Sequence, residues 1–176
     1  MEDSSLSPSA IINQLQQNDV THVVWLPDSE TNFMYDQMVL DQSIKIVSIC
    51  REGESLAIAA GLWVGGKKPV VMIQNTGMFE SGDSIRGLGL DIEIPLVLMI
   101  GYRGWTRHGI TRDSAARYTE PILNAWGINY YLVETDEDVL DALGSLMIGI
   151  HPVKDIAVRH LLGLTLNGRN TSRSTD

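Results

Sequence analysis

Cysteine is nearly absent from this chain of 176 residues, which contains only Cys50. A single cysteine cannot form an intrachain disulfide, and it cannot build a metal cluster with other cysteines. The four histidines lack the spacing of metal ligands and stand at His22, His108, His151 and His160. The sequence therefore predicts no metal site formed by this chain's own side chains.

Positive charge is also scarce, because 13 Lys and Arg residues face 22 Asp and Glu residues and give a formal net charge of -9. We therefore expect no nucleic acid partner. Long apolar runs are missing as well: none approaches the roughly 20 residues of a membrane span. The acidic, polar residues 1–5 do not resemble a signal peptide. These features predict a cytoplasmic protein that does not enter a membrane.

What the chain does contain is enough apolar material for one domain, since 44% of its residues are hydrophobic. Short apolar runs predict strands at 22–26, 44–49, 70–74, 94–100, 130–133 and from Ile156. Helical patterns lie between them, at 32–40, 53–64, 80–90, 119–126 and 136–148, after a first helix that starts at Ser7-Pro8. The polar segment 105–117 lacks apolar periodicity and is interpreted as a mobile loop.

Strands that alternate with helices are typical of an α/β fold. We expect a doubly wound, six-stranded, mostly parallel sheet with helices on both faces. One domain would span residues 1–166, and the polar residues 167–176 would form a disordered tail.

Polar residues follow four of the predicted strands, namely Asp28-Ser29, Glu52, Gln74-Asn75 and Arg103. The carboxyl ends of parallel strands meet at one edge of a sheet, so these side chains should lie close together. Glu52, next to a nearly all-apolar helix, is a candidate for a raised pKa and for proton transfer. The alternative is that Glu52 or Glu54 only stabilises a helix N-terminus electrostatically. The other polar residues are equally compatible with turns or caps, and the pattern names no reaction.

Two nucleotide-binding motifs can be excluded. The segment from Gly61 to Lys68 approaches a phosphate-binding loop, but Lys68 stands where that motif needs Ser or Thr. A helix is also predicted before the segment and a strand after it, which reverses the required order. No GxGxxG follows the first predicted strand, so a nicotinamide cofactor is not supported.

Several segments resemble the pyrimidine-binding (PYR) domain of thiamine diphosphate enzymes. Between Ser7 and Val158, the order and spacing of these segments are most similar to those in the alpha subunit of sulfopyruvate decarboxylase and in the N-terminal half of phosphonopyruvate decarboxylase. The segments that carry the resemblance are Leu26-Pro27-Asp28-Ser29, Arg51-Glu52-Gly53-Glu54 with Ala59-Ala60-Gly61, Gly65-Gly66-Lys67-Lys68-Pro69, Met72-Ile73-Gln74-Asn75-Thr76-Gly77, and Ile94-Pro95 through Gly101-Tyr102-Arg103-Gly104.

The resemblance implies roles for several of the matching positions, but none for Glu54. Glu52 would hydrogen-bond N1′ of the aminopyrimidine ring, stabilise its imino tautomer and so act in catalysis. Pro27, Gln74 and Asn75 would lie on the cofactor side, and Asp28 and Ser29 on the substrate side. The substrates of these decarboxylases carry a second acid group, for which the candidate cations are Arg103, Arg107 and Arg112.

The resemblance also implies a partner. In this family a separate PP domain binds the diphosphate and Mg²⁺ through a Gly-Asp-Gly motif, and the nearest match here, Ser81-Gly82-Asp83-Ser84, lacks the second glycine. The chain would therefore be the alpha subunit of a decarboxylase, active on a small anionic 2-oxo acid only with a PP-domain beta subunit, and self-associating through PYR domains.

Sulfopyruvate, converted to sulfoacetaldehyde and CO₂, is the first candidate substrate. A phosphonopyruvate decarboxylase subunit, or another thiamine diphosphate-dependent lyase or carboligase, is the alternative within the family. A non-catalytic, structural or regulatory PYR-like subunit is the alternative of another class.

Overall fold

A computed structural model of the chain describes residues 6–106, 108–148 and 162–166. Six strands form one sheet in which each neighbouring pair is parallel. Their order is β2 (Lys45–Ser48), β1 (His22–Trp25), β3 (Pro69–Gln74), β4 (Val97–Gly101), β8 (Leu162–Leu166) and β7 (Tyr130–Val133). The predicted parallel sheet is thus confirmed. The predicted strand start at Ile156 and the predicted tail at 167–176 lie outside the described residues.

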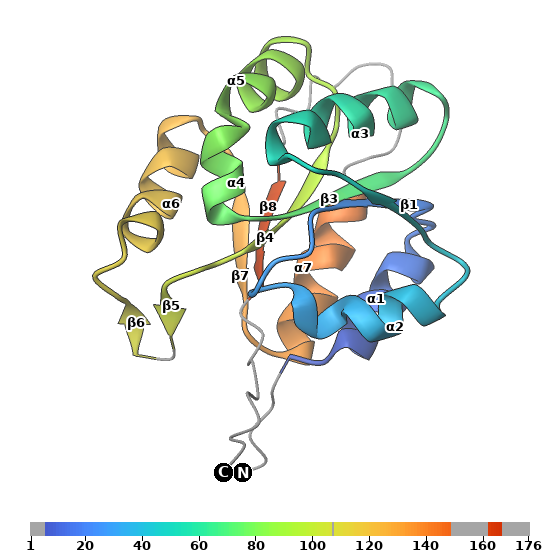
Figure 1. Cartoon of the computed structure of the whole chain (residues 1–176), viewed down its shortest axis with the longest axis horizontal. Coiled ribbons are helices and arrows are strands. Elements are labelled where there is room, and N and C mark those ends of the chain that lie inside the picture. Colours follow the sequence, from blue (N-terminus) through green and yellow to red (C-terminus); the bar gives the residue numbers. More distant parts are fainter. Residues whose placement is uncertain (1–5, 107, 149–161, 167–176) are drawn as a thin grey trace.

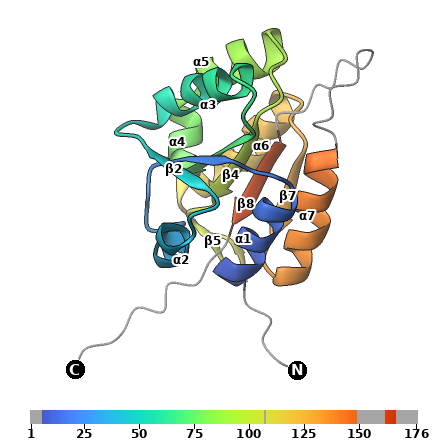
Figure 2. The same cartoon turned by 90° about the vertical axis from the view of Figure 1, so that its right-hand side faces the viewer.

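Helices cover both faces of the sheet, as Figures 1 and 2 show. One face carries α1 (Pro8–Gln17), α2 (Tyr35–Leu40), which follows the 3₁₀ turn η1 (Asn32–Met34), and α7 (Asp136–Ile148). The other face carries α3 (Ser55–Val64), preceded by the 3₁₀ turn η2 (Glu52–Glu54), then α4 (Asn75–Glu80), α5 (Gly82–Ser84), the π-helical segment η3 (Ile85–Asp91) and α6 (Ser114–Ala125). The predicted doubly wound arrangement is confirmed. Among the described helices, none has the length and apolar character needed to cross a membrane.

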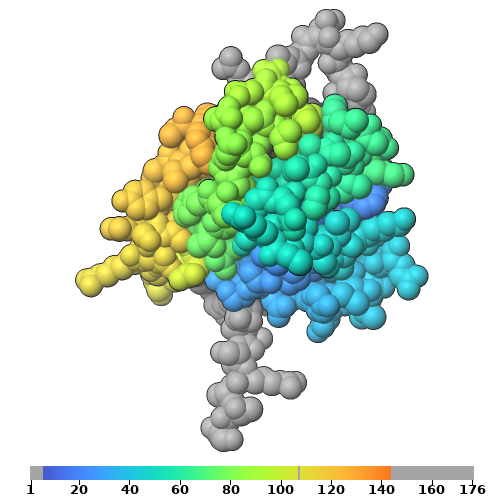
Figure 3. Space-filling view, turned by 45° about the horizontal axis from the view of Figure 1, so that its top comes forward, coloured from blue at the N-terminus to red at the C-terminus, as the bar shows by residue number. Residues whose placement is uncertain are grey.

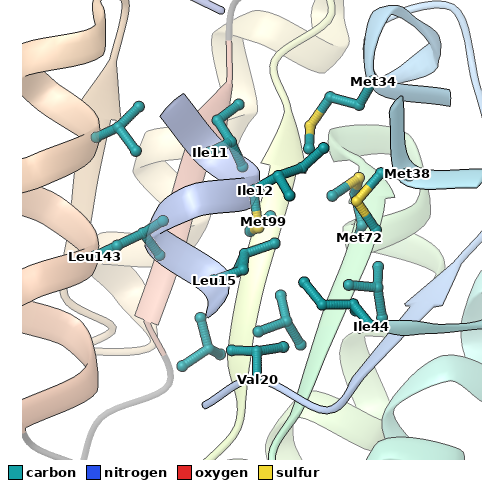
Figure 4. Close-up of a cluster of buried hydrophobic side chains, with 14 of the residues drawn as sticks. Ile11, Ile12, Leu15, Val20, Met34, Met38, Ile44, Met72, Met99 and Leu143 are labelled. Carbon is teal, nitrogen blue, oxygen red and sulfur yellow. The ribbon is translucent and has the colours of Figure 1, made fainter. Parts of the chain in front are cut away.

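The central strands are apolar along their whole length because both of their faces are covered. In β3, Val70 and Met72 join the core beneath α1 and α7, whereas Val71 and Ile73 join the core beneath α3 and α4. This follows from the two-residue period of a strand, which sends successive side chains to opposite faces. Figure 4 shows the first of these cores, in which the α1 side chains lie against Met72 and Met99.

The segment 105–117 is more regular than its sequence indicated. Two short strands, β5 (Trp105–Thr106) and β6 (Gly109–Ile110), pair antiparallel, and α6 begins at Ser114 rather than at residue 119. The Asp113 side chain caps this helix by accepting the N–H of Ala115 at 2.9 Å. The interpretation of the segment as a mobile loop was wrong for the residues of β5, β6 and the first turn of α6. The sequence did not show this start of α6, because the adjacent Ala115 and Ala116 form no apolar period.

The first prediction concerns the core beneath α1. Leu15 is fully buried there, whereas Leu40 at the end of α2 is 80% exposed. We expect Leu15→Ala to lower the free energy of unfolding by about 2–5 kcal/mol, because it removes buried methyl groups and leaves a cavity. The matched change Leu40→Ala should cost less than about 0.5 kcal/mol. Chemical denaturation measures both, and equal losses would contradict the packing described here.

Candidate functional site

The carboxyl ends of four neighbouring strands meet at one edge of the sheet. The chain leaving β2 stays next to β1, since the N–H of Ile49 donates to the carbonyl of Trp25 at 3.2 Å. At the ends of β3 and β4, Gln74 stands in register with Gly101. Figure 3 shows the surfaces of the segments that follow β1 (blue), β2 (teal) and β3 (green) adjoining one another. The predicted strand-end residues are therefore brought to one region.

Glu52 lies half-buried at the start of η2, in close contact with the backbone of α4. A Cβ atom built on Gly77 would stand 2.3 Å from Cγ of Glu52 and 2.9 Å from its Cδ, so only glycine fits at that position. Among the residues that the structure describes, none forms a hydrogen bond or ion pair with the Glu52 carboxylate. A half-buried carboxylate in this situation remains able to bind a ligand.

Glu54, two residues later, is used within the fold. Its Oε1 accepts the N–H groups of Cys50 and Arg51 at 2.9 and 3.3 Å, so it caps the turn, as expected for an acid at a helix start. The two glutamates of this segment therefore have different surroundings. Of the two, only Glu52 has a carboxylate that can still bind a ligand or exchange a proton with it.

A shallow surface hollow of about 430 Å³ adjoins this segment. An ion pair between Arg51 and Glu80, with Nε and Oε1 at 2.6 Å, forms part of its wall. The lining residues are Arg51, Gly53, Glu54, Glu80, Asp83 and Ser84. In the described part of the chain, no three His, Cys, Asp or Glu side chains are grouped closely enough to hold a metal ion.

The turn after β1 is held by Asp28. Its Oδ1 accepts the N–H groups of Glu30 and Thr31 at 2.7 and 3.1 Å, and its Oδ2 accepts the Thr31 hydroxyl at 3.0 Å. The same hydroxyl oxygen accepts the indole N–H of Trp25 at 3.0 Å. Asp28 thus braces the turn, whereas Pro27 and Ser29 are exposed.

Gln74 and Asn75 both lie buried where β3 passes into α4. The Gln74 Oε1 accepts the Thr76 hydroxyl at 2.8 Å. The Asn75 Nδ2 donates to the carbonyl of Arg103 and to Oγ1 of Thr119, both at 3.0 Å. Asn75 therefore joins α4 to the chain after β4 and to α6, and its buried Oδ1 has no hydrogen-bond partner among the described residues.

The three candidate arginines differ in their surroundings. Arg103 Nε donates to Oδ2 of Asp113 at 2.9 Å, and the Arg103 side chain is 53% exposed. The Ala115 N–H and then the Arg103 guanidinium hold the pKa of Asp113 below its ordinary value. Arg112 is exposed in the turn before α6, and Arg107 lies outside the described residues.

Glu120 of α6 connects this helix to the sheet through hydrogen bonds. Its two carboxylate oxygens accept the hydroxyls of Tyr102 and Tyr130 at 3.1 and 2.6 Å. Burial first, and then the Glu120 carboxylate, raise the pKa of Tyr102 above its ordinary value. Tyr102 also stacks on Trp105, with ring centroids 5.4 Å apart, which fixes the β5–β6 hairpin next to the strand ends.

Sequence reasoning missed Glu30, which lies half-buried beside Gly101. Burial first, and then the neighbouring Asp28, raise the pKa of the Glu30 carboxyl, while Arg103 opposes the rise. Gly77 and Gly101 were the available signals, because a glycine next to a strand end often marks a close approach of another segment. Neither glycine, however, indicates which side chain approaches it.

A substitution at Gly77 tests the contact with Glu52. Gly77→Ala should lower the free energy of unfolding by about 1–3 kcal/mol, because the new methyl group overlaps the Glu52 side chain. Gly61→Ala is the matched control, since a Cβ there has no atom within 4 Å and should leave stability unchanged or raise it. Adding Glu52→Ala to Gly77→Ala should restore part of the loss in a double-mutant cycle. Additive losses would contradict the contact.

Comparison with known proteins finds sequence similarity to subunits and parts of decarboxylases. The alpha subunit of sulfopyruvate decarboxylase from Methanocaldococcus jannaschii is 28% identical over 130 residues, which cover 73% of this chain and 77% of the relative. The alpha subunit from Methanococcus maripaludis is 23% identical over equally many residues, 73% of this chain and 78% of the relative. Phosphonopyruvate decarboxylase from Streptomyces hygroscopicus is 28% identical over 99 residues, 56% of this chain but 25% of that enzyme. No protein-family model matches the sequence.

Solved structures share the fold. A Mycobacterium smegmatis protein, assigned as a thiamin diphosphate-dependent enzyme, superposes with a TM-score of 0.68 and 18% identity over 99% of this chain and 34% of its own. Benzoylformate decarboxylase from Polynucleobacter necessarius superposes with a TM-score of 0.63 and 18% identity, over 96% of this chain and 33% of that enzyme. The chain is thus similar in sequence to sulfopyruvate decarboxylase alpha subunits and phosphonopyruvate decarboxylases. It covers about a third of the two solved enzymes whose fold it shares.

Proposed function

We propose that this chain is the alpha, PYR-type subunit of a two-subunit, thiamine diphosphate-dependent 2-oxo acid decarboxylase that converts sulfopyruvate to sulfoacetaldehyde and CO₂. Two sulfopyruvate decarboxylase alpha subunits match it over 77% and 78% of their own length. The observation that carries the proposal is Glu52, a half-buried carboxylate at the carboxyl edge of the parallel sheet, where such folds bind ligands.

The surroundings of Glu52 fit the pyrimidine end of the cofactor. Its carboxyl is reachable, and none of the described residues occupies it with a hydrogen bond or an ion pair. Glu52 would hold a proton at N1′ of the aminopyrimidine and keep the ring in its imino form. When bound, thiamine diphosphate supplies the carbon nucleophile and the electron sink that decarboxylation of a 2-oxo acid requires.

The other strand-end residues would shape the site around Glu52. Pro27 and Gln74 are proposed to line the cofactor side, and the exposed Ser29 to face the substrate. Asp28 and Asn75 would act mainly by holding loops, because both oxygens of Asp28 and the Nδ2 of Asn75 are hydrogen-bonded within the fold. Their contribution to cofactor and substrate binding would therefore be indirect.

A partner would complete the active site. We propose a beta subunit with a PP domain that holds the diphosphate and Mg²⁺, and self-association of this chain through its PYR domain. Two facts support this: the relatives matched over most of their length are alpha subunits, and the chain spans about a third of the larger solved enzymes.

The proposed substrate carries a carboxylate and a sulfonate, so it needs cations. Arg103 is the best placed, next to Gly101 and Asn75 at the strand ends, and Arg107 and Arg112 are further candidates. Phosphonopyruvate is the second candidate substrate, since a Streptomyces phosphonopyruvate decarboxylase is as similar in identity as the archaeal alpha subunit, 28% in each case. A purely structural subunit would have no use for an unpaired Glu52.

The tagged chain, purified from its own cells, is expected to bring a PP-domain subunit with it. That complex should release CO₂ from sulfopyruvate, whereas the chain alone should not. In the complex, Glu52→Gln should lower kcat at least about 100-fold, because the amide cannot exchange a proton with the cofactor. CO₂ release and NADH-coupled aldehyde reduction measure the rates.

Glu54→Gln is the matched control for Glu52→Gln. Its amide oxygen can still accept the Cys50 and Arg51 N–H groups, so activity should stay within a few-fold of the wild type. Full activity of the Glu52→Gln complex would favour the structural role over the catalytic one.

The substrate assignment is tested at Arg103. In the complex, Arg103→Ala should raise KM for sulfopyruvate about tenfold or more, which corresponds to the loss of one charge-assisted hydrogen bond. KM for pyruvate, which lacks the second acid group, should change less. Arg117→Ala is the control, since Arg117 lies exposed over the ring of Tyr118. An unchanged KM for sulfopyruvate would refute substrate binding by Arg103.

A further inference from the structure

The turn after β1 carries two carboxyl groups, those of Asp28 and Glu30, which differ in their hydrogen bonding. Both oxygens of Asp28 accept hydrogen bonds from the turn itself, from Glu30 N–H, Thr31 N–H and the Thr31 hydroxyl. Glu30 gives its backbone N–H to this network, and its carboxyl group is hydrogen-bonded by the side chain of Ser29 rather than by the backbone of the turn. Its carboxyl group therefore remains the reactive one of the pair.

Gly101 determines where the Glu30 side chain lies. A Cβ atom built on Gly101 would stand 2.7 Å from Cβ of Glu30 and 3.2 Å from Cγ2 of Thr31. The turn after β1 thus lies directly on the last residue of β4, which is in register with Gln74 of β3. The Glu30 side chain therefore leaves the backbone next to the carboxyl end of a central strand. Parallel sheets bind their ligands at this edge.

The groups that act on the Glu30 charge come from two elements. Asp28 and the Ser29 hydroxyl lie in its own turn, and Arg103 lies in the segment after β4. Burial is the largest effect, and Asp28 adds to it, so the protonated carboxyl is favoured, while Arg103 and Ser29 act in the opposite direction. Arg103 is itself held by Asp113, 2.9 Å from its Nε. A half-buried carboxyl in such surroundings is suited to donate a proton.

Conversion of a 2-oxo acid to an aldehyde consumes one proton. The bond between the keto carbon and the carboxylate breaks, CO₂ leaves, and the electron pair that remains at the former keto carbon is protonated. The donor must be restored from solvent before the next turnover. Glu52 does not supply this proton in the proposed function, because it serves the pyrimidine ring.

We propose that Glu30 is the general acid that protonates the former keto carbon after CO₂ has left. The inference rests on the proposed function and adds to it a residue of this chain that acts on the substrate carbon. The Glu30 carboxyl gives its proton to that carbon and takes another from water through the exposed side of the turn.

The first test needs no cofactor. In the chain labelled with ¹³C at the glutamate side chains, the carboxyl signal that disappears in Glu30→Gln reports the titration of Glu30. We expect a midpoint above the ordinary value of 4.5, and a further rise in Arg103→Ala, because the opposing cation is removed. A midpoint at or below 4.5 would overturn the proposal, since Glu30 would then be a poor proton donor.

The second test separates the two halves of the reaction in the purified complex. With sulfopyruvate in a rapid-quench experiment, Glu30→Gln should release CO₂ in the first turnover within about twofold of the wild-type rate, but form aldehyde at least about tenfold more slowly. Glu137→Gln, at an exposed position of α7, is the control and should change neither rate.

The outcomes distinguish this inference from the proposed function. If the wild-type complex releases CO₂ and Glu30→Gln slows CO₂ and aldehyde equally, or slows neither, Glu30 is not the proton donor. If the wild-type complex releases no CO₂, the proposed function itself fails and the inference falls with it.

Discussion

The contact between Glu52 and the backbone at Gly77 is the constraint on which the site depends. It holds the turn after β2 against the helix after β3 so closely that no side chain fits between them. The order of the strands then determines which loops lie next to this contact. Strand β1 lies between β2 and β3, and the turn after β1 reaches Gly101 at the end of β4. Two glycines, rather than a network of charges, thus allow segments from four strands to meet.

Polar side chains at this edge divide into those that hold the loops and those that remain able to react. Asp28 and the Nδ2 of Asn75 form hydrogen bonds inside the protein, and Glu54 caps a turn. The Glu52 carboxylate forms none with a described residue, and the Glu30 carboxyl is bonded by the Ser29 side chain of its own turn. A rigid frame of bonded side chains around two reachable carboxyl groups is the arrangement expected of a site that must hold a substrate in one orientation.

Much of the fold could be predicted from the sequence. Continuous apolar runs such as Val70 to Ile73, bounded by Pro69 and by Asn75-Thr76-Gly77, favour strands covered on both faces, and their alternation with helices indicates the fold class. Glu52 was also predictable, because it lies in the turn after a strand, just before an apolar helix. Glu30 and the β5–β6 hairpin were not, since their positions depend on contacts between segments far apart in the chain. The first turn of α6 shows no apolar period, because its buried residues Ala115 and Ala116 are adjacent, so its capping by Asp113 became visible only in the structure.

The order of the strands has a consequence for how the chain is made. Strand β8, at residues 162–166, lies between β4 and β7, although it is synthesised after both. Until it emerges, β4 lacks its outer neighbour and β7 has no strand to pair with. Open strand edges invite pairing with other chains. The growing polypeptide therefore passes through a stage with two unpaired edges, and a break in synthesis before residue 162 would leave it there.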